Sequence, residues 1–154
     1  MNKKGFTLVE LLAVIVILGV IITIAVVNVT SSMNRSRTGA FKNDATVLSD
    51  AALTKFSDDK LVKNYSEDLY NGTVSGKRCY SIQNSLKGKY AKVHNSSLVG
   101  SVEVCYDDTC KTRIWISNGV YNINGTEYDA IKDLTESTMK STTFNNKYNK
   151  CGKN

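Results

Sequence analysis

The apolar residues of this chain are concentrated in one stretch near the N-terminus. From Leu11 to Val27 every side chain is apolar, glycine or threonine, and none is charged. At about 1.5 Å per residue, a helix of this stretch spans about 25 Å, which is close to the hydrocarbon thickness of a bilayer. The rest of the chain is polar and rich in Asn, Ser, Thr and Lys. The pattern therefore predicts one membrane-compatible stem followed by one soluble head.

A one-sided pattern follows the stem. Apolar residues between Ser31 and Phe56 recur at spacings of four, three, four and four, which is one face of a helix; they are Phe41, Ala45, Leu48, Ala52 and Phe56. We predict one long helix over about residues 6–56, with residues 6–30 in lipid or in a filament core and residues 31–56 beneath the head. A separate amphipathic helix, beginning after a break at Ser31–Ser32 or at Gly39, is the alternative.

Five runs in the head have the composition of strands; they are Arg78–Ile82, Ala91–His94, Val102–Tyr106, Arg113–Ser117 and Val120–Ile123. They follow a polar connector over residues 57–76. We expect an antiparallel meander of three strands lying on the second half of the helix. The predicted fold class is therefore α+β, a ladle with a long N-terminal helix and an antiparallel β-sheet head over residues 57–154.

The turn signals set the expected register of the head. Asn118–Gly119 has the spacing of a two-residue type I′ turn, which places Ile116 opposite Tyr121 and Ile114 opposite Ile123. We expect the meander to end at the next Asn-Gly pair, Asn124–Gly125. A short helix around residues 130–134 and an irregular tail from residue 137 then complete the chain.

The four cysteines all fall in the head; they are Cys79, Cys105, Cys110 and Cys151. An even number of cysteines beyond a membrane segment favours disulfides in an oxidising, extracytoplasmic space. Zinc is the weaker reading, because His94 is the one histidine and the chain has no CxxC pair.

The hairpin pattern selects one of the three possible pairings. If Asp107–Asp108 is a two-residue loop, Cys105 and Cys110 lie directly opposite each other at a non-hydrogen-bonded position, where Cα atoms approach to about 4.5 Å. Cys79 is then left to pair with Cys151. The second bridge would tie the tail to the first strand.

Length, charge and motif content narrow the function. The 154 residues suggest one domain, and the net charge of +6 is mild and spread along the chain. With one histidine and no GxSxG, HExxH or glycine-rich phosphate loop, we predict no enzyme activity, no cofactor and no metal site. DNA is a further conceivable partner, through Lys77, Arg78, Lys87, Lys89 and Lys92.

The first ten residues carry the most information. Lys3 and Lys4 precede the apolar run, which predicts that this end stays in the cytoplasm and the C-terminus crosses the membrane. An ordinary secretory signal, cut near Ala25, would begin in the same way. Glu10 argues against it, because a carboxylate at the head of a membrane helix is costly and so is a functional candidate.

The run GFTLVELL at residues 5–12 resembles the class III signal of type IV prepilins and pseudopilins. The resemblance implies that residues 1–5 are a leader, that a prepilin peptidase cuts between Gly5 and Phe6, and that the new Phe6 amine is methylated. Glu10 then matches the glutamate at the fifth mature position of that family. Many pilins carry a proline where this chain has Val27, and the chain has no proline, so unwinding of the stem is less expected here.

The resemblance implies a structural subunit of a type IV pilus or related filament, held in the cytoplasmic membrane before assembly and extracellular afterwards. Its expected partners are further copies of itself, the prepilin peptidase, the inner-membrane assembly machinery and, before assembly, membrane lipid. The cleaved Phe6 amine lies four residues before Glu10 on the same helical face, so it can pair with Glu10 of its own chain or of a neighbour. Alternatives are a pseudopilin or minor pilin of a secretion or DNA-uptake system, and a monomeric signal-anchored surface binding protein.

Overall fold

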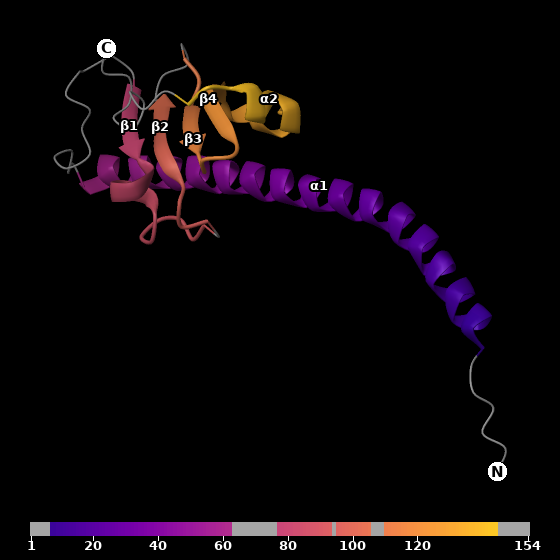
Figure 1. Cartoon of the computed structure of the whole chain (residues 1–154). Helices are drawn as coiled ribbons and strands as arrows, with labels where there is room; N and C mark the ends of the chain where they lie inside the picture. Colours follow the sequence, from indigo (N-terminus) through magenta and orange to yellow (C-terminus); the bar gives the residue numbers. More distant parts are fainter. Residues whose placement is uncertain (1–6, 63–76, 94, 106–109, 145–154) are drawn as a thin grey trace. The chain divides into compact units, whose positions relative to one another are not determined.

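The computed structural model describes residues 7–62, 77–93, 95–105 and 110–144. Its first element is a single helix, α1, Leu8–Val62, of 55 residues (Figure 1). The long helix predicted from the sequence is confirmed and extends six residues past Phe56. The alternative break at Ser31–Ser32 or Gly39 is wrong, since one glycine costs only about 1 kcal/mol in a helix of this length.

The two halves of α1 belong to different compact units, residues 1–37 and residues 38–154. In the first unit every described side chain as far as Met33 is exposed. In the second unit the predicted apolar face is buried, with Phe41 at 2% exposure and Ala45, Leu48 and Ala52 at 0%. The change from all-round apolar to one-sided apolar residues thus marks the point from which the helix buries one face in the hydrophobic core.

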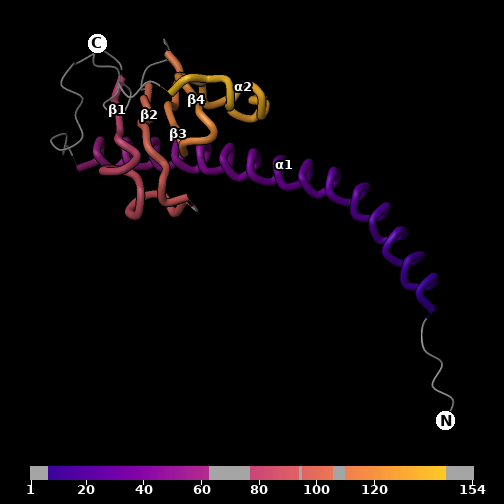
Figure 2. The backbone as a smooth tube through the Cα atoms, in the orientation of Figure 1, coloured from indigo at the N-terminus to yellow at the C-terminus, as the bar shows by residue number. Residues whose placement is uncertain are grey.

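The head is a four-stranded antiparallel sheet in the order β1-β2-β3-β4 (Figures 1 and 2). The strands are β1, Lys77–Ser81, β2, Val99–Cys105, β3, Arg113–Ser117, and β4, Asn122–Glu127. The predicted α+β class and antiparallel meander are confirmed, with four strands instead of three. The run at Ala91–His94 is not a strand in its described part: Ala91 makes one isolated bridge with Lys87, and residue 94 is not described.

The core lies between the inward face of the sheet and the second half of α1. Its core members from the sheet are each at most 2% exposed; they are Tyr80, Val102, Val104, Ile114, Ile116 and Ile123. Because inward and outward side chains alternate along a strand, this set fixes which face of each strand meets the helix.

The pairing of β2 with β3 differs by one residue from the predicted two-residue loop. That loop would place Glu103 opposite Thr112, whereas the structure places Glu103 opposite Arg113 and Val102 opposite Ile114. A shift of one residue moves every side chain of a strand to the other face of the sheet. The observed register puts Val102 and Ile114, both 0% exposed, into the core together.

The turn between β3 and β4 has four residues instead of the predicted two. Ile116 therefore pairs with Ile123, and the expected pairing with Tyr121 is wrong by two residues. Asn118 supplies the reason, because its Oδ1 accepts hydrogen bonds from the backbone N–H groups of Val120 at 3.0 Å and Tyr121 at 2.8 Å. A shift of two residues preserves the faces of the strand, so the core composition survives the error.

The sheet does not end at Asn124–Gly125 as predicted. β4 continues to Glu127 through an irregularity opposite Ile114 and Trp115. Gly125 has a φ of +72°, and a Cβ there would lie 3.1 Å from Nε1 of Trp115. The indole therefore packs on the glycine, and the Asn-Gly pair acts as a kink within the strand.

Short helical segments flank the sheet. The turn η1, Ile82–Leu86, follows β1, and η2, Tyr128–Asp133, occupies the place predicted for a short helix around residues 130–134. The expectation of an irregular tail from residue 137 is wrong for its described part, because α2, Glu136–Ser141, forms there. Thr135 caps α2, and Met139, at 0% exposure, anchors it in the core.

The side chain of Lys42 hydrogen-bonds the C-terminal end of η2 to α1. Its Nζ donates to the backbone oxygens of Lys132 at 2.6 Å and Leu134 at 2.9 Å, at the end of η2. The lysine thus satisfies carbonyl groups that a helix end leaves without intrahelical partners.

Lys55 is enclosed where α1 meets β1. Its Nζ lies 3.2 Å from Oδ1 of Asp59 and 5.5 and 5.6 Å from the ring centroids of Tyr80 and Tyr90. The hydroxyl of Tyr80 donates to Oδ2 of Asp59 at 3.2 Å. Burial, together with the nearby carboxylate, raises the pKa of Tyr80 above its usual range.

Candidate functional site

The described part of the N-terminal site begins at Thr7; Gly5 and Phe6, the predicted cleavage and methylation residues, lie outside the described residues. Glu10 is exposed in the first turn of α1. Its Oε2 accepts hydrogen bonds from both the backbone N–H and the Oγ1 of Thr7, each at 2.9 Å. The Oγ1 of Thr7 in turn accepts from the backbone N–H of Glu10 at 3.3 Å.

This reciprocal pair is a capping box, in which the side chains of the cap residue and of the third helical residue satisfy each other's backbone N–H groups. Thr7 and Glu10 therefore start α1 where the apolar run starts. The sequence analysis considered Glu10 only as a charged group that needs a positively charged partner, and it missed the role of Glu10 in capping the N-terminus of α1. The Thr-x-x-Glu spacing before an apolar run was the available signal.

The stem beyond the cap is long and apolar enough to cross a membrane. Among the described residues α1 alone meets that criterion of length and composition, and none of the side chains in its apolar window is buried within the chain. A row of exposed apolar side chains, including Ile17, Ile21 and Ile24, is unfavourable in water. Lipid or other stems are the environments that suit this surface.

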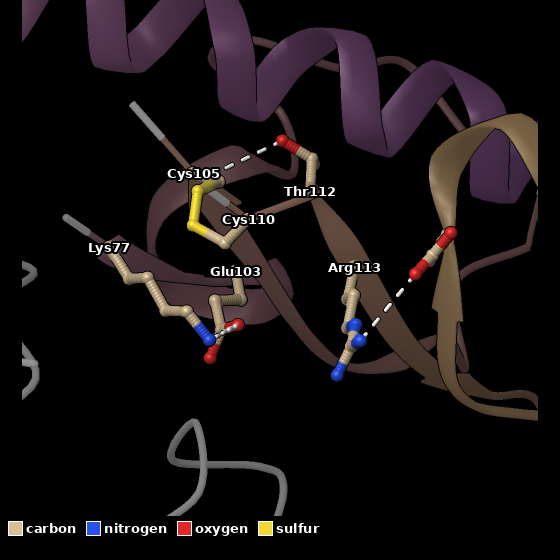
Figure 3. Close-up of a disulfide and its surroundings, with 7 residues drawn as sticks. Lys77, Glu103, Cys105, Cys110, Thr112 and Arg113 are labelled. Carbon is tan, nitrogen blue, oxygen red and sulfur yellow. Dashed lines mark hydrogen bonds and ion pairs between the residues drawn. A yellow bond between two sulfur atoms is a disulfide. The ribbon is translucent and has the colours of Figure 1, made fainter. Parts of the chain in front are cut away.

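The disulfide predicted for the hairpin is present. Cys105 and Cys110 are bonded, with their Cα atoms 5.8 Å apart (Figure 3). This separation exceeds the 4.5 Å expected for a directly opposite pair, in keeping with the shifted register of β2 and β3. Cys79 also belongs to a disulfide, while Cys151, its predicted partner, lies outside the described residues.

The outward face of the sheet carries charges of alternating sign. Lys77 pairs with Glu103 at 3.1 Å (Figure 3). Glu127 pairs with Lys111 at 3.0 Å and with Arg113 at 3.5 Å. The hydrogen bond from the Lys111 ammonium lowers the pKa of Glu127, and the same contact raises the pKa of Lys111. Exposed pairs of this kind add little stability but keep the face polar.

The basic residues considered for DNA mostly have other contacts. Lys77 pairs with Glu103, and Arg78 lies over the ring of Phe56 at 6.0 Å, on the opposite side of β1 from Lys77 because neighbouring strand residues alternate. Lys87 donates to the backbone oxygen of Ser96, and Lys89 lies over the ring of Tyr90 at 5.4 Å. These residues do not form one uniformly basic surface.

The described residues contain no group of three or more His, Cys, Asp or Glu side chains arranged to hold a metal ion. The N-terminal end of α1 combines three features of the candidate site. There, a capped helix start, a carboxylate and a long exposed apolar surface follow one another without interruption.

Comparison with known proteins gives one match. The family model for the prokaryotic N-terminal methylation motif matches residues 1–26, the part of the chain that holds Gly5, Phe6 and Glu10. No curated protein and no solved structure matches the chain. The first 26 residues are therefore the class III prepilin signal of type IV pilins and pseudopilins.

Proposed function

We propose that this protein is a structural subunit of a type IV pilus or a related filament. It is made as a membrane-held prepilin, cut between Gly5 and Phe6, methylated on the Phe6 amine and polymerised through its stem. The observation that carries the proposal is the prepilin signal at residues 1–26 running directly into an unbroken helix whose apolar surface is exposed. The signal implies a peptidase and assembly partners, and it favours a structural subunit over an enzyme.

The processing step is tested at Gly5. Glycine suits a cleavage site because a side chain would obstruct the close approach of the peptidase to the backbone. Gly5→Val should leave the precursor uncut and retained in the membrane, as measured by N-terminal sequencing and mass. Mature protein of normal length from this variant would remove the basis of the proposal, and a wild-type protein that begins elsewhere than Phe6 would favour a signal-anchored monomer.

The role of Glu10 has two components, and two variants separate them. Glu10→Gln removes the charge but keeps a side chain that fits the capping box, since glutamine also serves at that position. Thr7→Val removes the hydroxyl of the box, at a cost of about 1 kcal/mol to the helix start, and leaves the carboxylate in place.

If Glu10 pairs with the Phe6 amine of a neighbour, Glu10→Gln should abolish most filaments, because leaving a buried charge without its partner costs about 3–5 kcal/mol. Thr7→Val should assemble nearly normally. Filaments sheared from cells and quantified by immunoblot give the measurement, with total processed protein as the control. Normal assembly of Glu10→Gln together with failure of Thr7→Val would show that Glu10 acts as a helix cap and not as a charge.

The same signal also serves pseudopilins, so a secretion or DNA-uptake subunit is the second candidate. Abundance in sheared surface filaments separates the two, because a major pilin dominates such a preparation. DNA binding is not favoured, since Lys77, Arg78, Lys87 and Lys89 already contact other residues. Salt-dependent DNA binding by the isolated head would reverse that judgement.

A further inference from the structure

One side of the stem carries a regular row of residues with a polar residue at each end. Members of this row, which we call the stem seam, recur at spacings of four, three, four, three and four; they are Glu10, Val14, Ile17, Ile21, Ile24 and Asn28. All six lie in α1 and are exposed. Alternating spacings of three and four keep residues on one side of a helix, as in the contact line of a coiled coil.

Glu10 and Asn28 bracket the uncharged stretch from Leu11 to Val27. The 18 residues between their positions make five helical turns, so the two side chains leave the helix in the same direction about 27 Å apart. Between them the seam is entirely β-branched, which gives stiff side chains suited to interdigitation with another helix. A single polar residue at one end would specify the axial position of a stem relative to its neighbour. Two polar residues on one line would also specify the rotation of the stem about its own axis.

Asn28 is only weakly satisfied by its own helix. Its Nδ2 donates to the backbone oxygen of Ile24 at 3.4 Å, which uses one of the two amide donors and leaves the acceptor lone pairs of Oδ1 out of that contact. Thr23 behaves differently, because its hydroxyl donates to the backbone oxygen of Val20 at 2.7 Å. Thr23 lies 13 residues from Glu10, on the opposite side of the helix.

We propose that Asn28 is a second register contact of the assembled stem. In the filament its amide would hydrogen-bond a polar group on the stem of a second copy of this chain, and with Glu10 it would set both the rotation and the axial stagger of neighbouring stems. This inference rests on the proposed filament function. The occupant is another copy and not lipid, because the prepilin signal implies assembly, and acyl chains offer the amide no hydrogen-bond partner.

The physical basis is the cost of a misplaced amide. While the prepilin is in the membrane, Asn28 lies at the outer end of the apolar stretch and can reach interfacial water. When stems pack, that water is displaced, and a slip of one turn, about 5.4 Å, would press the amide against apolar side chains. A single asparagine in an otherwise apolar contact line specifies register in this way. Its contribution to helix association in an apolar medium corresponds to about a three- to tenfold change in the association constant.

The test uses full-length prepilin in the cell that produces it, with three variants. Asn28→Leu removes the amide, Asn28→Gln keeps it, and Thr23→Val removes a hydroxyl that is satisfied on its own helix and lies on the other side. Processing at Gly5 is measured first, then the yield of sheared filaments and the temperature at which they release subunits.

We expect all three variants to be processed normally. Asn28→Leu should lower filament yield at least threefold and release subunits at a lower temperature, Asn28→Gln should recover part of the loss, and Thr23→Val should match the wild type. Equal yield and release temperature for Asn28→Leu and wild type would overturn the inference while leaving the filament function intact. Absence of filaments from the wild type under conditions where processing is complete would overturn both.

Discussion

Gly100 gives the sharpest test of how the head is built. It lies in β2 opposite Ile116, with a φ of +142°, in a region that side-chain-bearing residues rarely adopt. A Cβ at this position would lie 2.0 Å from the backbone oxygen of Trp115 and 3.0 Å from the Cα of Ile116. These are backbone atoms of β3, so they cannot move aside as a flexible side chain could. Gly100→Ala must therefore either part β2 from β3 or change the path of β2.

The expected loss has two parts. The strained backbone costs about 1–3 kcal/mol, and forced overpacking costs about 1–3 kcal/mol more. Together they come to about 2–6 kcal/mol, a large share of the roughly 5–15 kcal/mol by which a domain is stable. With a urea dependence near 2 kcal/mol per molar, the unfolding midpoint should fall by about 1–3 M.

The assay is urea unfolding of a fragment beginning at Ser31, which omits the apolar stem and should be a soluble, folded monomer. Gly119→Ala is the matched control: its φ is +85°, but a Cβ at this position would meet open space within 4 Å, so only backbone strain of about 1–2 kcal/mol applies. A Gly100→Ala fragment that loses less stability than Gly119→Ala would refute the register of β2 and β3 described above. Aggregation or unaided filament formation by the unsubstituted fragment would instead show that the stem does not drive polymerisation.

Three further outcomes are expected in the same fragment. Met139→Ala should lower the free energy of unfolding by about 2–5 kcal/mol in urea titration, since the side chain is wholly buried; a change under about 1 kcal/mol would mean that α2 is not anchored there. The hydrogen bond from Lys111 lowers the pKa of Glu127, so their pairing stabilises the fold above the ordinary carboxyl pKa and is lost as the pH falls through the lowered pKa of Glu127. The stability advantage of wild type over Glu127→Gln should therefore shrink as the pH falls below the ordinary glutamate pKa of about 4.3, and a pH-independent difference would contradict this expectation. Cys79→Ser should destabilise the fragment more than Cys110→Ser does in thermal unfolding. The predicted Cys79–Cys151 bridge would close a loop of about 73 residues and contribute about 4 kcal/mol, whereas the hairpin bridge would contribute roughly half of that. Peptide mapping that links Cys79 to Cys105 would refute the pairing.

The stem was predictable because its signals are local. An uncharged run from Leu11 to Val27 and a face spaced at four and three residues each specify helix without reference to the rest of the chain. The C-terminal end of the helix was harder to predict from the sequence, because α1 continues to Val62 through residues whose side chains are mostly exposed. Beyond Phe56 no apolar period remains to be followed.

The sheet was predictable in type but not in register. Asn118–Gly119 matches the sequence of a two-residue turn, yet the side chain of Asn118 closes a longer one by accepting from Val120 and Tyr121. Between β2 and β3 the decisive influence was burial: Val102 and Ile114 must share the core face, and a turn signal contains no information about that demand.

In the candidate site, sequence reasoning selected Glu10 and assigned it an intermolecular role, which stays a prediction, whereas the structure shows it as part of a helix cap. The charge drew attention to an intermolecular partner, while the hydroxyl of Thr7 three residues earlier had the spacing of a helix cap. Asn28 was overlooked because it stands just outside the apolar run that defined the stem. The predicted helix already contained both Glu10 and Asn28, and their separation of 18 residues, five full turns, was the signal that places them on one side.

Because Lys55 is enclosed in the folded head, the chemical reactivity of its amine reports whether the head is folded. The side chain is 12% exposed, with Asp59 and the rings of Tyr80 and Tyr90 around its ammonium. An acylating reagent needs open access to the amine, and the enclosure of Lys55 in the native head restricts that access. Labelling of Lys55 should therefore lag far behind that of exposed lysines such as Lys60 and Lys132 and rise to match theirs on unfolding. Mass spectrometry of that one lysine would distinguish folded heads from unfolded ones in a mixed sample.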